Sequence, residues 1–295
     1  MSQDATGESR PGHLVIIGGA EDRTDDKLVL GRFVELLGLS DPAIVLVTAG
    51  NGDPEHAWEA YDRAFGDLGV KRRQMIDLCS REAANDGAAV RQVLEADGIF
   101  MTGSDQKRLV AALGGSAVAE AMRRAFRERG VCLGGTSAGA SALSDYMLVP
   151  GLDDGATQDS PPLAAGLGFV QRVVIDQHFS ERKRLGRLLT VVAHNPSLLG
   201  IGIDEDTALI VEPGGGIEVV GDGAVTLIDG RQMSSNFLSS QGRQRLELID
   251  VKLHLLPPGA RYRCEDQMPT RKSRRAPDPL RDIVSILTSQ GAHLS

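Results

Sequence analysis

The sequence contains little cysteine. Cys79, Cys132 and Cys264 are the three cysteines in 295 residues, and they are too few and too scattered for a disulfide framework or a CxxC zinc site. No apolar run approaches the roughly 18 residues that a membrane-spanning helix needs. The polar segment Met1–Pro11 also lacks the apolar centre of a signal peptide. We therefore expect a cytoplasmic, reducing setting and no membrane partner.

Basic residues are fewer than acidic residues, and aromatic residues are also few. The chain has 32 Lys and Arg against 40 Asp and Glu, a net charge of -8, which argues against a nucleic-acid partner. Aromatic residues make up 4%, whereas glycine occurs 35 times. Few aromatics and many glycines are typical of an α/β protein with tight turns between strands and helices.

Apolar runs alternate with helical patterns over the first two thirds of the chain. The expected strands cover residues 13–17, 43–48, 73–78, 98–102, 131–134 and 173–175. Each ends in a turn that leads to a helix, so the pattern predicts an α/β fold: a mostly parallel sheet with helices on both faces. Shorter runs with Pro-Gly or Gly-Asp turns predict antiparallel strands at one edge, at 200–203, 208–211, 217–220 and 225–228.

The chain shows no internal repeat and no convincing linker before residue 264. We expect a disordered N-terminus over 1–11 and a single α/β domain over 12–264. Residues 265–295 begin with a charged, proline-rich stretch and are expected to form a flexible extension. Within it, the i, i+3, i+4, i+7 spacing of apolar residues from Leu280 to Leu287 predicts a short helix.

The most informative segment is Gly135-Thr136-Ser137-Ala138-Gly139, which lies between an expected strand and a helix. This GxSxG pattern is typical of a nucleophile elbow, where small neighbours allow a sharp turn that raises the serine above the sheet edge. The N–H of Ala138 at the helix start is a candidate oxyanion donor. The structural alternative is a glycine-rich turn with a capping serine.

A nucleophilic serine needs a base, and the sequence has six histidines. His178 directly follows an expected strand, within Asp176-Gln177-His178, so it is predicted at the carboxyl end of a strand, where sites in α/β sheets form. The other five lie at less favourable places: His13, His56, His194, His254 and His293. His178 is therefore the candidate base.

The third member of a triad should be a carboxylate that orients the imidazole. Glu205 lies at another expected strand end and is the candidate, with Asp204 and Asp206 as neighbouring rivals. Asp153 and Asp154, after the elbow helix, are a second option. With Glu205 the chain order is Ser, His, acid, which differs from the Ser, acid, His order of α/β-hydrolases.

Several segments together resemble the cyanophycinases, in the family of serine peptidases that also contains dipeptidase E. The DQHFSER-x-RLGR run is the most specific of them, and the likeness spans about residues 13–260. The matching segments are residues 18–22, 102–106, 134–140, 176–182 with 184–187, and 202–208.

The resemblance implies a flavodoxin-like or class I glutaminase-like fold and a homodimer. It implies hydrolysis of cyanophycin, a poly-aspartate with arginine on each β-carboxyl, to β-aspartyl-arginine dipeptides. It also assigns Ser137 as nucleophile, His178 as base and Glu205 as orienting acid. Ser104, where the family often has glycine, can still supply an oxyanion N–H if its φ is negative. The implied substrate-binding positions are Gln106, Asp176, Gln177, Arg182, Arg184 and Arg187.

The charges of such a substrate fit these residues. Arg182, Arg184 and Arg187 can donate bidentate hydrogen bonds to substrate carboxylates. Asp176, and with it Gln106 or Gln177, can accept hydrogen bonds from a substrate guanidinium. The alternative for the arginines is a solvated helix face.

Three other functions compete with this interpretation. A phosphate-binding module could use Gly18-Gly19 at a helix entry, but the chain lacks GxxxxGK[ST] and a complete GxGxxG signature, and we expect no cofactor or metal. A class I glutaminase would need cysteine at position 137. A dipeptidase E-like aspartyl peptidase is the closest alternative, and the arginine cluster and Gln106 argue against it.

Overall fold

The computed structural model describes residues 11–50, 52–149, 162–238, 246–264 and 273–289. The expected disordered segment falls, apart from Pro11, outside these residues. The helices are α1 (Leu28–Leu37), α2 (Pro54–Asp67), α3 (Gly87–Glu95), α4 (Gln106–Leu113), α5 (Ala117–Arg129), α6 (Ala138–Ala142), α7 (Leu185–His194) and α8 (Asp278–Thr288), with a 3-10 turn at Ala83–Asn85.

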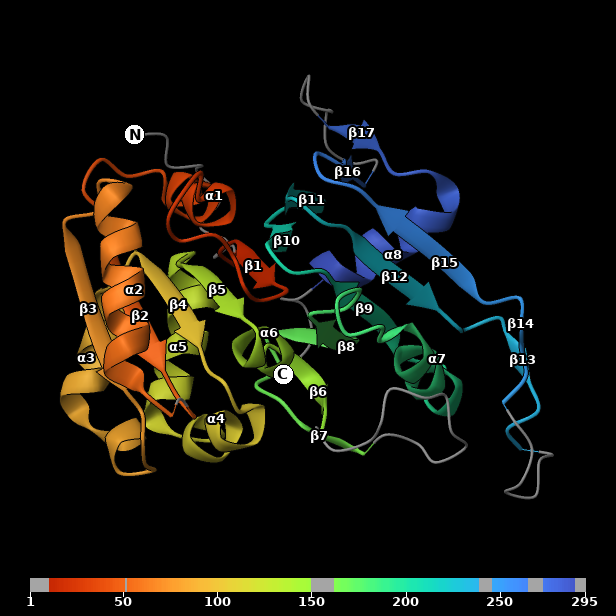
Figure 1. Ribbon diagram of the computed structural model, residues 1–295, viewed down its shortest axis with the longest axis horizontal. Coiled ribbons are helices and arrows are strands. Elements are labelled where there is room, and N and C mark those ends of the chain that lie inside the picture. The colour runs from red at the N-terminus through yellow and green to blue at the C-terminus, as the bar shows by residue number, and fades with distance from the viewer. Residues whose placement is uncertain (1–10, 51, 150–161, 239–245, 265–272, 290–295) are drawn as a thin grey trace.

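A nine-stranded sheet, sheet A, extends from the part of the molecule that contains α2 and α3 to the part that contains α8 (Figure 1). Five of its strands run parallel, in the spatial order β5, β4, β2 and β3 outward from β1. They are β1 (Leu14–Ile17), β2 (Ala43–Thr48), β3 (Arg72–Asp77), β4 (Gly98–Thr102) and β5 (Cys132–Thr136). The predicted α/β fold with a mostly parallel sheet is thus confirmed.

The other edge of sheet A is closed by strands of mixed direction, as the turn-rich sequence after residue 198 predicted in part. β10 pairs antiparallel with β1, β11 with β10 and β16 with β11, and β17 then runs parallel to β16. Their bounds are β10 (Thr207–Glu212), β11 (Gly216–Gly221), β16 (Arg261–Arg263) and β17 (Arg274–Arg275).

The sequence did not predict the division into two sheets. Sheet B has the order β15-β12-β9-β8-β6-β7 and holds the expected strands at 173–175, 200–203 and 225–228. Helix α7 connects β8 to β9, and this crossover allows the two strands to pair parallel. Strand β12 pairs antiparallel with β9. The bounds are β6 (Ser144–Leu148), β7 (Leu163–Ala165), β8 (Val170–Gln177), β9 (Leu199–Ile203), β12 (Val225–Asp229) and β15 (Lys252–Leu256); a separate hairpin pairs β13 (Ser234–Ser235) with β14 (Leu248–Ile249).

Alternation along the strands explains how both faces of each sheet are covered. In β1, Leu14 and Ile16 pack into the core that contains α3, α5 and α8, while Val15 and Ile17 pack against α1 and α2. In β8, Val174 faces α7. Successive residues of a strand point to opposite faces, so apolar runs of this kind need helices on both sides.

The predicted C-terminal helix is present as α8, and it is part of the domain. Leu280, Ile283, Val284 and Leu287 are buried in the main core. Helix α8 contacts β10, β11 and β16 of sheet A and β8 of sheet B, and Figure 1 shows it between the two sheets. Residues 273–288 were expected within a flexible extension. Instead they pack against both sheets, because α8 has a continuous apolar stripe that is buried between them.

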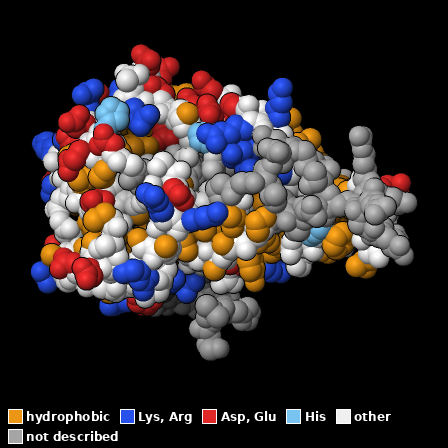
Figure 2. Space-filling view, turned by 60° about the horizontal axis from the view of Figure 1, so that its bottom comes forward, with side chains coloured by type: hydrophobic (Ala, Val, Ile, Leu, Met, Phe, Trp, Pro, Cys, Tyr) orange, Lys and Arg blue, Asp and Glu red, His pale blue; other side chains and the backbone are white. Residues whose placement is uncertain are grey.

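Over the residues that the structure describes, no helix combines the length and apolarity needed to span a bilayer. Acidic and basic side chains are interspersed on the face in Figure 2, without division into one large basic region.

Candidate active site

Ser137 lies in the sharp turn between β5 and α6. Its backbone angles, φ 52° and ψ -115°, are outside the ordinary range for a non-glycine residue. Such a conformation costs about 1–3 kcal/mol and persists only where the surroundings enforce it. A Cβ atom at Gly135 would lie 2.8 Å from the Gly139 carbonyl oxygen, and one at Gly139 would lie 2.4 Å from the Met101 oxygen. The turn thus has the geometry that the GxSxG pattern predicts, and both glycines are needed for it.

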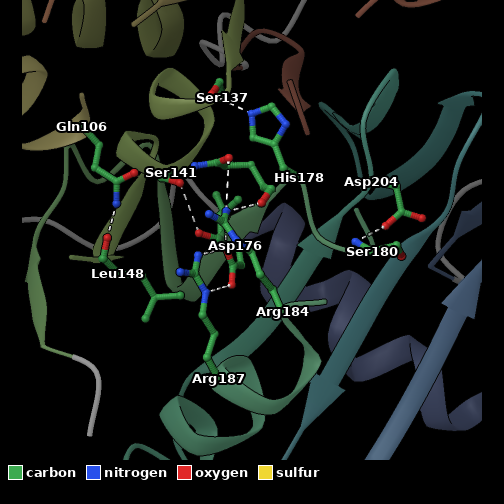
Figure 3. Close-up of polar contacts among 12 residues, drawn as sticks. Gln106, Ser137, Ser141, Leu148, Asp176, His178, Ser180, Arg184, Arg187 and Asp204 are labelled. Carbon is green, nitrogen blue, oxygen red and sulfur yellow. Dashed lines mark hydrogen bonds and ion pairs between the residues drawn. The ribbon is translucent and has the colours of Figure 1, made fainter. Parts of the chain in front are cut away.

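A chain of hydrogen bonds links Ser137 to His178 and Glu205. Ser137 Oγ lies 3.1 Å from His178 Nε2, and His178 Nδ1 lies 2.5 Å from Glu205 Oε1. His178 follows β8 and is 8% exposed, and Glu205 lies in the turn between β9 and β10. Figure 3 shows the imidazole of His178 pointing toward Ser137. This arrangement can remove a proton from the serine and stabilise the resulting imidazolium.

The neighbouring acids of Glu205 have other partners. Asp204 is nearly buried, and its carboxylate accepts hydrogen bonds from the N–H groups of Ser180 and Ala224, at 3.1 and 3.0 Å. Asp206 Oδ1 accepts a hydrogen bond from the Asp22 N–H at 2.8 Å, and partial burial raises the pKa of the Asp206 carboxyl. Of residues 204–206, it is Glu205 that contacts the imidazole.

The second acid option, Asp153 and Asp154, lies outside the described residues.

The two candidate oxyanion donors follow neighbouring strands. Ala138 is buried and begins α6, so its N–H has no acceptor within the helix. Ser104 follows β4, which pairs with β5, and it is not among the residues with positive φ. The Ser104 hydroxyl donates a hydrogen bond to the Gly50 carbonyl at 2.9 Å. Both segments therefore lie at the same edge of sheet A as the half-buried Ser137.

Asp176, Arg184 and Arg187 form a buried ion-pair cluster beside the triad. Arg184 Nη1 donates to Asp176 Oδ1 at 3.1 Å, and Arg187 Nε donates to Asp176 Oδ2 at 2.6 Å. Arg187 Nη2 also donates to Oδ1, which makes that pair bidentate. Arg184 further contacts the backbone and side-chain oxygens of Gln177, and Figure 3 shows the cluster. Both oxygens of Asp176, expected to receive a substrate guanidinium, thus accept from arginines of the protein.

The other two expected substrate-binding residues are placed differently. Gln106 is buried at the start of α4, and its side-chain amide donates to the Leu148 carbonyl. Arg182 is exposed in the turn before α7 and forms no ion pair with another described residue. Its guanidinium is therefore accessible to an anionic ligand.

Gly18 and Gly19 are part of the resemblance, but the sequence predicts no catalytic role for them. In the structure, the Gly18 carbonyl accepts a hydrogen bond from the His178 N–H at 2.8 Å. Gly19, with φ 98°, leaves the space that the imidazole fills. Two successive glycines after a strand were the available signal for this close approach.

The comparison with protein-family models gives the family of this chain. The family model for peptidase family S51 matches residues 14–219. The chain belongs to peptidase family S51. It is accordingly a serine-type peptidase, as the elbow at Ser137 predicted.

Relatives of this S51 peptidase carry a more specific name. It is 35% identical over 262 residues to a cyanophycinase from Geminocystis herdmanii, covering 87% of this chain and 95% of the relative. It is also 35% identical to a cyanophycinase from Trichormus variabilis, over 84% of each chain. Among solved structures, a peptidase from an acI-B1 actinobacterium superposes with a TM-score of 0.66 at 21% identity, covering 87% of this chain and 98% of that one. That likeness supports the fold.

Proposed function

We propose that this S51 peptidase is a cyanophycinase that hydrolyses cyanophycin to β-aspartyl-arginine dipeptides through an acyl-enzyme on Ser137. The observation that carries the proposal is the hydrogen-bonded chain Ser137–His178–Glu205 beside an arginine-rich cluster. The two cyanophycinase relatives, matched over most of their length, support the choice of substrate.

The proposed reaction follows from the triad geometry. His178 Nε2 accepts the hydroxyl proton as Ser137 Oγ bonds to a backbone carbonyl carbon of the substrate. The developing oxyanion is held by the N–H groups of Ala138 and Ser104. When the C–N bond breaks, His178 donates its proton to the leaving amine, and Glu205 stabilises the imidazolium meanwhile. A water molecule then bonds to the ester carbonyl carbon and gives a proton to His178. When the bond from this carbon to Ser137 Oγ breaks, His178 returns the proton to Oγ, and the dipeptide leaves with a free carboxylate.

The substrate's charges are proposed to be read by the neighbouring residues. Each repeat of the polymer carries one carboxylate and one guanidinium. The cluster of Asp176, Arg184 and Arg187 contains two cations and one anion, so it keeps a net positive charge that favours a substrate carboxylate. Asp176 acts here by holding the two arginines, while the exposed Arg182 binds a second carboxylate. Gln106 and Gln177 complete the proposed binding set.

The resemblance to the cyanophycinases also supports a homodimer in the cytoplasm. Sedimentation of the purified protein at micromolar concentration tests the dimer directly, since a monomeric mass there would contradict it.

The experiment for the proposed function is incubation with purified cyanophycin and identification of the products by mass spectrometry. We expect β-Asp-Arg dipeptides from the wild type and none from Ser137→Ala. An N-terminal aspartyl dipeptide and an α-linked poly-aspartate serve as comparison substrates. Cleavage of the aspartyl dipeptide without cleavage of cyanophycin would contradict the proposal and favour a dipeptidase E-like activity.

A further inference from the structure

Glu21 lies buried next to the proposed nucleophile elbow and is not part of the proposed triad. It is 3% exposed, and no described residue forms an ion pair with it. Its Oε2 atom accepts a hydrogen bond of 2.6 Å from the Thr136 hydroxyl, and its Oε1 atom accepts from the Tyr61 hydroxyl. Thr136 directly precedes Ser137. Burial of a carboxylate without a cation partner costs free energy, even where two hydroxyl groups donate hydrogen bonds to it.

Tyr61 extends this network to the neighbouring strand. It comes from α2, is 3% exposed, and its hydroxyl also contacts the side chain of Thr102 at the end of β4. Burial, and then the charge of Glu21, raises the pKa of Tyr61. The network therefore runs from Thr102 through Tyr61 and Glu21 to Thr136.

The network lies where strands β4 and β5 end. The ladder between β4 and β5 ends at the pair Met101–Gly135, so Thr102 and Thr136 stand opposite each other just beyond its last pair. These two threonines immediately precede the segments that carry Ser104 and the Ser137–Ala138 turn. The hydrogen bonds of Glu21 to Tyr61 and Thr136, together with the contact of Tyr61 with Thr102, connect the two strand ends beyond the backbone ladder.

The loop that carries Glu21 also supports the rest of the triad. Its Gly18 carbonyl accepts from the His178 N–H, and its Gly19 carbonyl accepts from the Asp206 N–H at 2.9 Å, next to Glu205. The Asp22 N–H in turn donates to the Asp206 carboxylate. Residues 18–22 thus contact the backbone or the immediate neighbour of each triad member.

We infer that Glu21 is a positioning residue for catalysis, acting through Thr136 and Tyr61 to hold the strained Ser137 turn and both oxyanion donors in register. This role rests on the proposed function in so far as Ser137 is the nucleophile. The strain at Ser137 needs surroundings that enforce it, and the hydrogen bond of Glu21 to Thr136 fixes the residue directly before Ser137. A displacement of about 1 Å in such a site can cost on the order of 100-fold in rate.

The test compares Glu21→Gln and Thr136→Val with Thr136→Ser, which keeps the hydroxyl. The first readout is the rate at which a serine-directed fluorophosphonate labels Ser137, which does not depend on the choice of substrate. The second is kcat and KM on cyanophycin. We expect labelling rate and kcat to fall about 10- to 100-fold in Glu21→Gln and Thr136→Val, with KM within about twofold of wild type and Thr136→Ser close to wild type.

Glu212→Gln is the matched control, because Glu212 is also a buried glutamate, 7% exposed, and pairs with arginines of β16. It should lower thermal stability and leave the labelling rate of the folded protein unchanged. The double variant Glu21→Gln/Thr136→Val should lose little more than either single variant, since both remove one network.

Two results would overturn the role of Glu21. One is labelling and kcat within about twofold of wild type in both network variants. The other is a loss that disappears when rates are corrected for the folded fraction, or that Glu212→Gln reproduces. Wild-type protein labelled at Ser137 but inactive on cyanophycin would instead refute the proposed substrate, and Glu21 would then be judged on labelling alone. An unlabelled and inactive wild type would overturn both proposals.

Discussion

The imidazole of His178 packs directly against Gly19. A Cβ atom on Gly19 would lie 2.5 Å from both Cε1 and Nε2 of the ring, and Nε2 is the atom that contacts Ser137. The candidate base can therefore take this position only because residue 19 has no side chain.

Gly19→Ala should consequently disable the enzyme while leaving most of the fold intact. The methyl group would push Nε2 away from Ser137, and we expect kcat to fall by on the order of 100-fold or more. Gly38→Ala is the control, because Gly38 also has positive φ, 63°, but open space around its Cα. It should cost about 1–2 kcal/mol of stability, as left-handed alanine does, and keep full kcat. Equal activity of the two variants would contradict the packing argument.

Variants of the triad should differ in severity. Ser137→Ala and His178→Ala should each lower kcat by on the order of 10⁴-fold or more. Glu205→Gln should cost less, because the imidazole still acts when it is less well oriented. Initial rates on cyanophycin, with circular dichroism as the check of folding, measure this. If Glu205→Gln is fully active while Asp153→Asn or Asp154→Asn is inactive, the orienting acid is Asp153 or Asp154.

Much of the candidate triad was predictable from sequence because its signals are local. The GxSxG spacing marks the elbow, and a histidine directly after an apolar run marks a strand end. The ion pairs of Asp176 with Arg184 and Arg187 were not predictable, since the same charges could equally face a substrate. The contact of Glu21 with Thr136 joins residues 115 positions apart, and the division into two sheets depends on which strands pair; neither leaves a periodic pattern in the chain.

The arginines should contribute to substrate binding, and lysine should replace Arg182 better than it replaces Arg187. A lost charge-assisted hydrogen bond costs roughly 1.5–3 kcal/mol, so Arg182→Ala and Arg187→Ala should each lower kcat/KM by about 10- to 150-fold on β-Asp-Arg oligomers. Arg187→Lys should rescue only part, because lysine lacks the planar fork that holds Asp176. Arg182→Lys should rescue more, since Arg182 is exposed. Wild-type kinetics in all three alanine variants, including Arg184→Ala, would identify a purely structural or solvated role.

His13 should make stability depend on pH in the weakly acidic range. Burial, and then the charge of Arg32, lowers the pKa of His13 in the folded protein. Below about pH 6.5 the unfolded chain therefore takes up this proton before the folded protein does, so the free energy of unfolding falls as pH falls. In His13→Gln, the urea midpoint should drop less between pH 7 and pH 5 than in wild type. Parallel curves for the two proteins would contradict this assignment.

The position of helix α8 late in the chain affects folding during synthesis. The strands that it covers, β8 of sheet B and β10 and β11 of sheet A, leave the ribosome well before residues 278–288. Until then, the apolar faces that later receive Ile283 and Leu287 are open to solvent or to other nascent chains. The two sheets can complete their joint core only late in synthesis, which is the interval in which a chaperone would have most to protect.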